Sequence, residues 1–265
     1  MAKGLLRRIG VSVGCLAAAL AAGAALAGCF DVQQSMTLQR DLSGQAAFSM
    51  TVNFEPMVQF MAEFQRSMAG QKGEPTAAEL EKVRQDFLAS RKSKAEDSPV
   101  NKEKLEKSLP PGIKLIDSSV QDQGLKMVVH LRFAFDNVAK LGQINLPSEG
   151  ADQPGSKNPF DRPFGGLQVV DEGKTLLLTS PATNPLPAKE SMPSGPDLSP
   201  DVAKQMEAVF KGFRVAFQIE TPFEVVESNA TRREGKTLYW EYDLNSIKKM
   251  TPEQSKTGIR ARFRK

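Results

Sequence analysis

Cysteine and histidine are scarce in this chain. Its 265 residues contain two cysteines, Cys15 and Cys29, and one histidine, His130. Both cysteines belong to an apolar leader or to its end, so the rest of the chain has no thiol for a disulfide bond or a metal site. Without a second histidine or a cysteine partner, an ordinary zinc site is excluded as well. We therefore expect no metal, no cofactor, and a fold held together by its core.

Motifs of known catalytic sites are also missing. The sequence has no G-x-S-x-G nucleophile elbow, no Walker motif and no dinucleotide fingerprint. Ser246–Lys249 fits S-x-x-K and Lys256–Gly258 reads K-T-G, as in penicillin-recognising enzymes. In those enzymes the two motifs lie far apart with a third polar motif between them, whereas here they almost adjoin. We expect no catalysis from them, and we expect His130 on an exposed strand face with Lys126 and Arg132.

The chain lacks a strong charge of either sign. It has 35 Lys and Arg against 31 Asp and Glu, and three of the cations, Lys3, Arg7 and Arg8, belong to the leader. Without the leader the balance is 32 − 31 = +1. A nucleic-acid partner is therefore not expected, and any electrostatic role must come from local clusters.

The leader has the layout of a secretory signal. Its cations precede an uncharged run rich in Ala, Gly and Leu, 9–25. The run leads into Leu26, Ala27, Gly28 and Cys29, which resemble a bacterial lipobox. That resemblance implies cleavage before Cys29, a diacylglyceryl group on its sulfur and an acyl chain such as palmitate on the new amino terminus. An uncleaved membrane anchor and ordinary cleavage are the alternatives, but Ala and Gly are weakly apolar and neither alternative needs a lipobox.

Lipidation at Cys29 would place the protein in the cell envelope, attached to a membrane. Two or three acyl chains hold a protein stably on a bilayer, whereas one chain does so only marginally. In a bacterium with two membranes, Phe30 rather than Asp after the cysteine favours the outer one. Residues 1–28 are then the signal peptide, and 29–265 form one domain of about 237 residues, since 265 − 28 = 237.

Periodicity in 29–265 predicts an α+β fold, a largely antiparallel β-sheet with helices packed on one face. Predicted strands are 32–40, 45–54, 113–120, 125–135, 166–171, 174–179, 213–219, 223–227, 236–243 and 257–263. Predicted helices are 55–69, a charged insert at about 76–108, a short helix after Ser199 and a turn at 244–250. Pro- and Gly-rich loops are expected at about 146–166 and 181–200.

A methionine and phenylalanine face recurs at helical spacing within 55–69. It consists of Met57, Phe60, Met61, Phe64 and Met68. We expect this face to pack the helix on the sheet. A wall for an apolar ligand and a membrane-lying surface are the alternatives, although Arg66 is the only cation on the polar face. A lipid binder would need a cavity between helix and sheet, and a scaffold would have a closed core there.

A second pattern is a basic stripe near the C-terminus. Lys256, Arg260, Arg262 and Arg264 share one face of the last strand, shortly after Lys248 and Lys249. We expect a solvated face paired with Glu241 and Asp243. Contact with anionic headgroups or glycans is the alternative.

The order of these segments resembles a known family. The matching pieces are the lipobox, the turn at 41–44, Leu-Pro-Pro-Gly-Ile-Lys at 109–114, Phe-Ala-Phe-Asp at 133–136, 221–230, Gly235 and Tyr239-Trp240. Together they resemble the LppM-like bacterial envelope lipoproteins. The resemblance implies an α+β sheet domain on a membrane and, for some members, contact with lipid. It supplies no catalytic residues, and the chain has no C-terminal apolar run like the one expected in mycobacterial members.

These observations favour a non-catalytic lipoprotein of the cell envelope, a module near the membrane that binds a lipid, a glycan or a protein. An envelope hydrolase with an unrecognised site and a purely structural envelope protein are the alternatives.

Overall fold

The computed structural model describes residues 30–71, 73–92, 102–146, 162–180, 212–250 and 258–265. They form two β-sheets, mostly antiparallel, with a few helices, so the predicted α+β class is confirmed. The leader, Cys29, the helix expected after Ser199 and most of both Pro- and Gly-rich loops lie outside the described residues.

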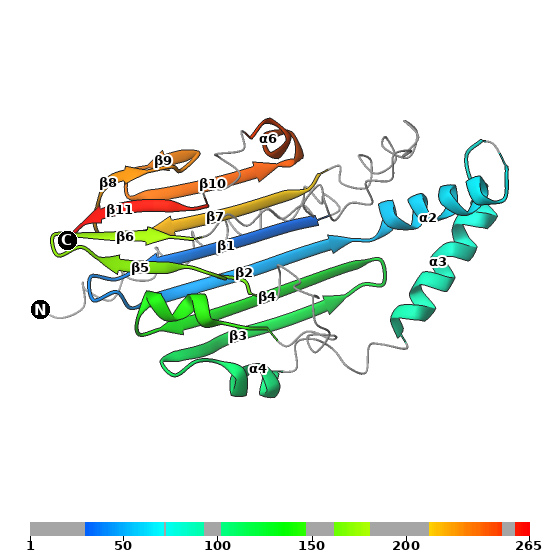
Figure 1. Cartoon of the computed structure of the whole chain (residues 1–265). Helices are drawn as coiled ribbons and strands as arrows, with labels where there is room; N and C mark the ends of the chain where they lie inside the picture. Colours follow the sequence, from blue (N-terminus) through cyan, green and yellow to red (C-terminus); the bar gives the residue numbers. More distant parts are fainter. Residues whose placement is uncertain (1–29, 72, 93–101, 147–161, 181–211, 251–257) are drawn as a thin grey trace, which may run out of the picture.

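The larger sheet has seven strands in the order β3-β4-β2-β1-β7-β10-β9 (Figure 1). Their bounds are β1 Phe30–Leu38, β2 Gly44–Asn53, β3 Ile113–Asp122, β4 Lys126–Phe135, β7 Arg214–Glu220, β9 Arg232–Glu234 and β10 Thr237–Asp243. All neighbours are antiparallel except β1 and β7, which are parallel. The hairpins β1–β2 and β3–β4 are those predicted from alternation, while β9 was not predicted.

One face of this sheet is apolar because the strand register aligns the apolar positions. Met36 of β1 lies between Ala46 of β2 and Ile219 of β7, and Phe217 of β7 lies opposite Trp240 of β10. Successive strand residues point to opposite faces, so the intervening positions form a second, polar face. The alternation seen in the sequence therefore holds across the sheet.

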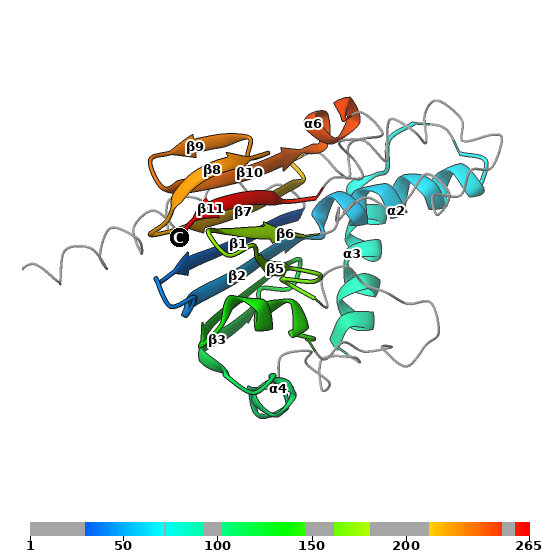
Figure 2. The ribbon, with the colours of Figure 1, turned by 60° about the vertical axis from the view of Figure 1, so that its left-hand side comes forward.

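A second sheet covers much of the apolar face (Figure 2). Its order is β5-β6-β11-β8, with β5 Gln168–Asp171, β6 Thr175–Thr179, β8 Glu224–Ser228 and β11 Arg260–Arg264. Leu178 and Phe263 from this sheet join Phe48, Leu131 and Trp240 in one buried cluster. The expectation that helices cover the core face is thus corrected in part: the short strands late in the chain form the covering layer together with buried residues of two short helices.

Asn229 joins the two sheets. The indole Nε1 of fully buried Trp240 donates to its Oδ1 at 2.8 Å, as does the backbone N–H of Arg260 at 2.8 Å. Its Nδ2 donates to the carbonyl of Gly258 at 2.7 Å. The side chain of Asn229 therefore forms hydrogen bonds both with the largest core residue of the larger sheet and with the backbone at the start of β11 in the smaller sheet.

The longest helices lie beyond the sheets, whereas two short ones contribute Leu105, Val138 and Leu141 to the core. The bounds of the helices are α2 Glu55–Met68, α3 Ala77–Lys92, α4 Lys102–Ser108, the 3-10 helix η3 Val138–Gln143 and α6 Leu244–Lys249. Helices α2 and α3 extend beyond one end of the larger sheet (Figure 1). The charged insert, expected to be helical to Lys107, is described as two helices, and 93–101 between them lie outside the described residues.

Helix α3 begins as the sequence predicted. Thr76 Oγ1 accepts from the N–H of Glu79, and the Glu79 carboxylate accepts from the Thr76 N–H at 2.7 Å, which is a capping box. The Thr76 hydrogen bonds, aided by Arg66, lower the pKa of Glu79 from 4.5 to about 2.

Candidate functional site

The candidate site lies at the sheet end where the described chain begins, which we call the Phe30 end. Phe30 opens β1 opposite Val52, close to the last residue of β2. Arg214, the first residue of β7, pairs with Asp31, and β10 ends beside it at Asp243. Helices α2 and α6 both follow strands that finish at this end. The first residue after Cys29 and the start of α2 are therefore neighbours.

Phe54 fixes the position at which α2 leaves the sheet. Its N–H donates to the carbonyl of Leu125 in the β3–β4 turn at 2.7 Å. Its ring packs against Phe87 of α3 with centroids 5.3 Å apart, and the guanidinium of Arg91 lies 4.4 Å from its ring centroid. Arg91 also donates to the Gly124 carbonyl and binds Asp122, at 2.9 and 2.8 Å. Both helices are thus docked on one turn of the sheet.

The inner side of α2 packs on α3. Val58 and Ala62 are buried against Val83, and the partly buried Met61, Leu80, Phe87 and Leu125 surround them. This cluster is separate from the core between the sheets. The buried contact between the two helices is therefore made by small side chains, and Met61 is the one residue of the methionine and phenylalanine face that takes part in it.

Most of the methionine and phenylalanine face points outward. Met57, Phe64 and Met68 are 41, 48 and 75 % exposed. Phe60 is half-buried and its ring stacks on Phe64 with centroids 6.2 Å apart. The expectation that this face packs on the sheet is wrong, because α2 extends past the sheet end and α3 covers a different side of it. Of the five predicted residues, Met61 belongs to the inner cluster; we call Met57, Phe60, Phe64 and Met68 the outer stripe.

The outer stripe is continuous and carries no charge. Successive helix residues are about 100° apart, so its four side chains fall within an arc of about 80°. The charged groups of α2 lie elsewhere and have partners. Arg66 binds Glu79 at 2.6 Å, Glu55 binds Arg84 at 2.5 Å, and Glu63 accepts from Gln59 at 2.7 Å.

The basic stripe is neutralised by acidic neighbours. Arg262 contacts Glu172 and Glu227 at 3.0 and 2.5 Å, Arg264 contacts Glu224 at 2.8 Å, and Arg260 contacts Glu227 at 3.6 Å. Arg262 lowers the pKa of Glu172, as expected for a carboxylate beside a cation. Pairing was predicted, but the partners lie on β8 and the β5–β6 turn.

The other predicted members of the basic stripe are Lys248, Lys249 and Lys256. Lys249 is exposed in α6, whereas Lys256 and the side chain of Lys248 lie outside the described residues. Strand β11 and the C-terminus lie away from α2 (Figure 1).

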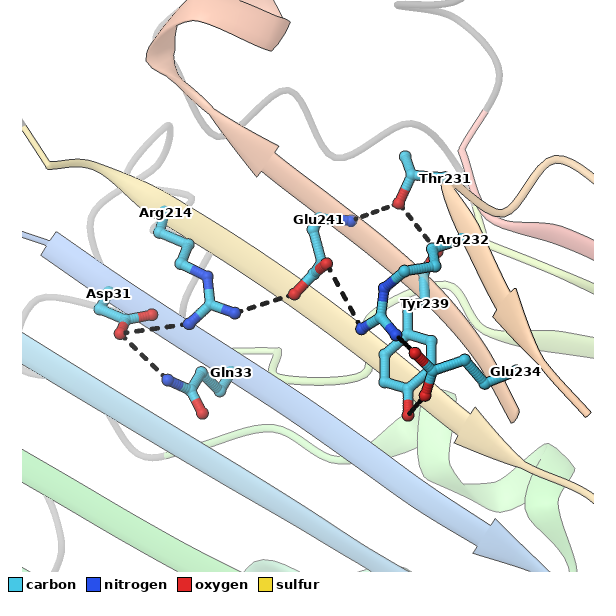
Figure 3. A network of polar contacts seen from close by, with 8 residues as sticks. All are labelled: Asp31, Gln33, Arg214, Thr231, Arg232, Glu234, Tyr239 and Glu241. Carbon is cyan, nitrogen blue, oxygen red and sulfur yellow. Dashed lines mark hydrogen bonds and ion pairs between the residues drawn. The ribbon is translucent and has the colours of Figure 1, made fainter. Parts of the chain in front are cut away.

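The expected partners Glu241 and Asp243 have other contacts. Glu241 binds Arg214 at 2.9 Å and Arg232 at 3.7 Å, and Arg214 reaches Asp31 at 4.0 Å (Figure 3). Arg232 stacks on Tyr239 at 3.7 Å and binds Glu234. These ion pairs run across the polar face of the larger sheet and link each of the strands β1, β7, β10 and β9 to its neighbour. Asp243 instead caps α6.

The motif fragments have structural roles. The Ser246 hydroxyl accepts from the Asp243 N–H at 2.7 Å, and the Asp243 carboxylate accepts from the Ser246 N–H at 2.7 Å. The Ser246 hydrogen bonds lower the pKa of Asp243. His130 lies between Ser49 and Ser119 on the polar sheet face and is half-buried, less open than predicted.

Within the described ranges, no three His, Cys, Asp or Glu side chains gather in a way that suits a metal ion. Of the helices described, none combines the length and the apolarity needed to cross a bilayer.

No protein-family profile and no curated protein matches this chain. Among solved structures, it is similar to the folded domain of Mycobacterium tuberculosis LppM, determined by NMR. The TM-score is 0.39 and the identity 13 %, over 89 % of this chain and 90 % of that one. The likeness is a weak one of fold, to a domain from the group that the sequence resembles.

Proposed function

We propose that this protein is a lipid-anchored lipoprotein of the bacterial cell envelope, a non-catalytic module near the membrane that binds a lipid, a glycan or a protein. One observation carries the proposal. Strand β1 begins at Phe30, directly after the lipobox cysteine, and lies in the interior of the larger sheet between β2 and β7.

An interior strand is hydrogen-bonded along both edges, so its first residue cannot move independently of the sheet. One residue spans at most about 3.6 Å, so acyl chains on Cys29 would hold the Phe30 end within roughly 10 Å of the bilayer surface. A lipoprotein that reaches far from its membrane would need a spacer between the cysteine and the fold. The sequence has none at this point.

The absence of a catalytic role is supported by the fragments that resembled motifs. Ser246 of the S-x-x-K fragment caps α6, and Gly258 of the K-T-G fragment accepts a hydrogen bond from Asn229. Both residues have a structural role that needs no reaction. A hydrolase with an unrecognised site and a purely structural protein are the alternatives to a binding module.

The anchor is tested by feeding cells an alkyne analogue of palmitate and measuring its incorporation into the full-length protein. We expect the wild-type chain and a Cys15→Ala variant to be labelled and Cys29→Ala to remain unlabelled and uncleaved. Cys15→Ala is the matched control, because it removes a thiol from the same leader. Labelling that survives Cys29→Ala, or is absent from the wild type, would refute the anchor.

A further inference from the structure

We propose that the outer stripe of α2 rests on the bilayer to which Cys29 is anchored and makes a second, non-covalent membrane contact. This inference depends on the proposed anchor. It assigns to Met57, Phe60, Phe64 and Met68 a partner of definite chemistry, the acyl and headgroup boundary of a phospholipid bilayer.

The outer stripe is largely exposed. Met68 is 75 % and Phe64 48 % exposed on a helix whose buried contacts are made by Val58 and Ala62. Scattered apolar residues on a surface need no explanation, but a continuous stripe does. The same helix thus has a short apolar contact for α3 and a longer apolar stripe that α3 does not cover.

Helix α2 starts at the sheet end where β1 begins. Phe30 pairs with Val52, and α2 begins at Glu55, just beyond the end of that strand. The anchor and the helix therefore leave the same end of one rigid sheet. Helix α2 has 14 residues and is about 20 Å long, and it extends beyond the sheet end from which Cys29 would leave (Figure 1).

The outer stripe carries no charge. No charged side chain falls inside the arc of the stripe, so insertion would bury no ion. Arg66, the helix's cation, is held by Glu79, and a helix that binds membranes unaided is usually rich in Lys and Arg. This helix suits a contact in which the acyl chains supply the attachment and the stripe sets the orientation. Because charge contributes little, the contact should be insensitive to salt.

The test uses the full mature protein, reconstituted in vesicles of phosphatidylethanolamine and phosphatidylglycerol. A Met68→Cys variant is labelled with an environment-sensitive dye, and spin-labelled phospholipids are added as quenchers. Val226→Cys on β8 is the matched control, because Val226 is 46 % exposed but lies on the smaller sheet. We expect lipid quenching of the dye at position 68, at low and high salt, and none at position 226.

Equal quenching at both positions, or none at position 68, overturns the inference. A blue shift at position 68 without quenching by lipid also overturns it, because a second copy or another protein then covers the stripe. The wild-type chain tests the anchor separately, since acylation of Cys29 leaves the mature protein without a free thiol. A wild type that takes the dye refutes the anchor, and this inference with it; an unlabelled wild type without quenching at position 68 refutes this inference alone.

Discussion

The orientation of α2 can be tested by two substitutions on the same helix, Val58→Ala on its inner side and Phe64→Ala in the outer stripe. Val58 is fully buried, and truncation removes two methyl groups at about 0.8 kcal/mol each, with a further term for the cavity. Alanine returns about 0.5 kcal/mol through its higher helix propensity. We expect a loss of about 1.5 kcal/mol.

Phe64 should be the milder site despite its size. With 48 % of the residue exposed, only about half of a phenylalanine's burial is lost, and the helix propensity of alanine offsets part of that. The expected loss is about 1 kcal/mol. If the stripe packed on the sheet, as periodicity predicted, truncating Phe64 would cost about 3 to 5 kcal/mol.

Amide hydrogen exchange can measure the loss of stability caused by each substitution within α2 and α3 themselves. Because α2 and α3 have their own cluster, their amides should report local opening while those of β4 stay unchanged. Exchange in α2 should rise about tenfold for Val58→Ala and about fivefold for Phe64→Ala. A rise above about a hundredfold for Phe64→Ala, or a matching rise in β4, would refute the assigned orientation.

The pKa of Glu79 is about 2 in the folded state, against an ordinary 4.5. The ionised carboxylate therefore stabilises α3 fully above about pH 4.5, and this stabilisation is lost as the pH falls toward 2. In a Glu79→Gln variant, the helical circular dichroism signal should no longer change with pH across that range. Trp240→Phe removes the hydrogen bond to Asn229 and leaves a cavity in the core. Urea unfolding should therefore show a free energy of unfolding about 2 kcal/mol lower than that of the wild type. A decrease below about 0.5 kcal/mol would contradict the role of Asn229 in joining the sheets. Arg264→Gln should leave adsorption to anionic vesicles unchanged, because Glu224 already pairs with Arg264; a clear fall in co-sedimentation would restore the headgroup hypothesis.

Much of the fold could be predicted because strand alternation is a local signal. The register from Phe30–Val52 to Leu38–Gly44 follows from two alternating runs and a short turn. The capping box of Thr76 and Glu79 is equally local. The pairing of β1 with β7 could not be predicted in this way, because the two strands lie far apart in the sequence and the residues of neither strand indicate which strand it pairs with.

The candidate site was harder to predict, because helical periodicity shows which residues share a face but not what that face meets. The methionine and phenylalanine residues of α2 share a helical spacing and were therefore expected to pack on the sheet. The structure instead buries Val58 and Ala62, in a separate cluster against α3. The sequence feature that could have indicated this arrangement is Phe54, an aromatic residue between the strand and the helix. In the structure its ring contacts Phe87 and Arg91 of α3 and so holds both helices at the end of the sheet.

The central claim, that the Phe30 end faces the membrane, is tested most directly by energy transfer from a dye on a single cysteine to acceptor lipids in the reconstituted protein. Gln123→Cys places the dye in the β3–β4 turn at the Phe30 end, and Arg40→Cys places it in the β1–β2 turn at the other end; both positions are exposed. Nine residues of β1 span about 30 Å, so transfer should be strong at position 123 and weak at position 40. Equal transfer, or stronger transfer at position 40, would contradict the account.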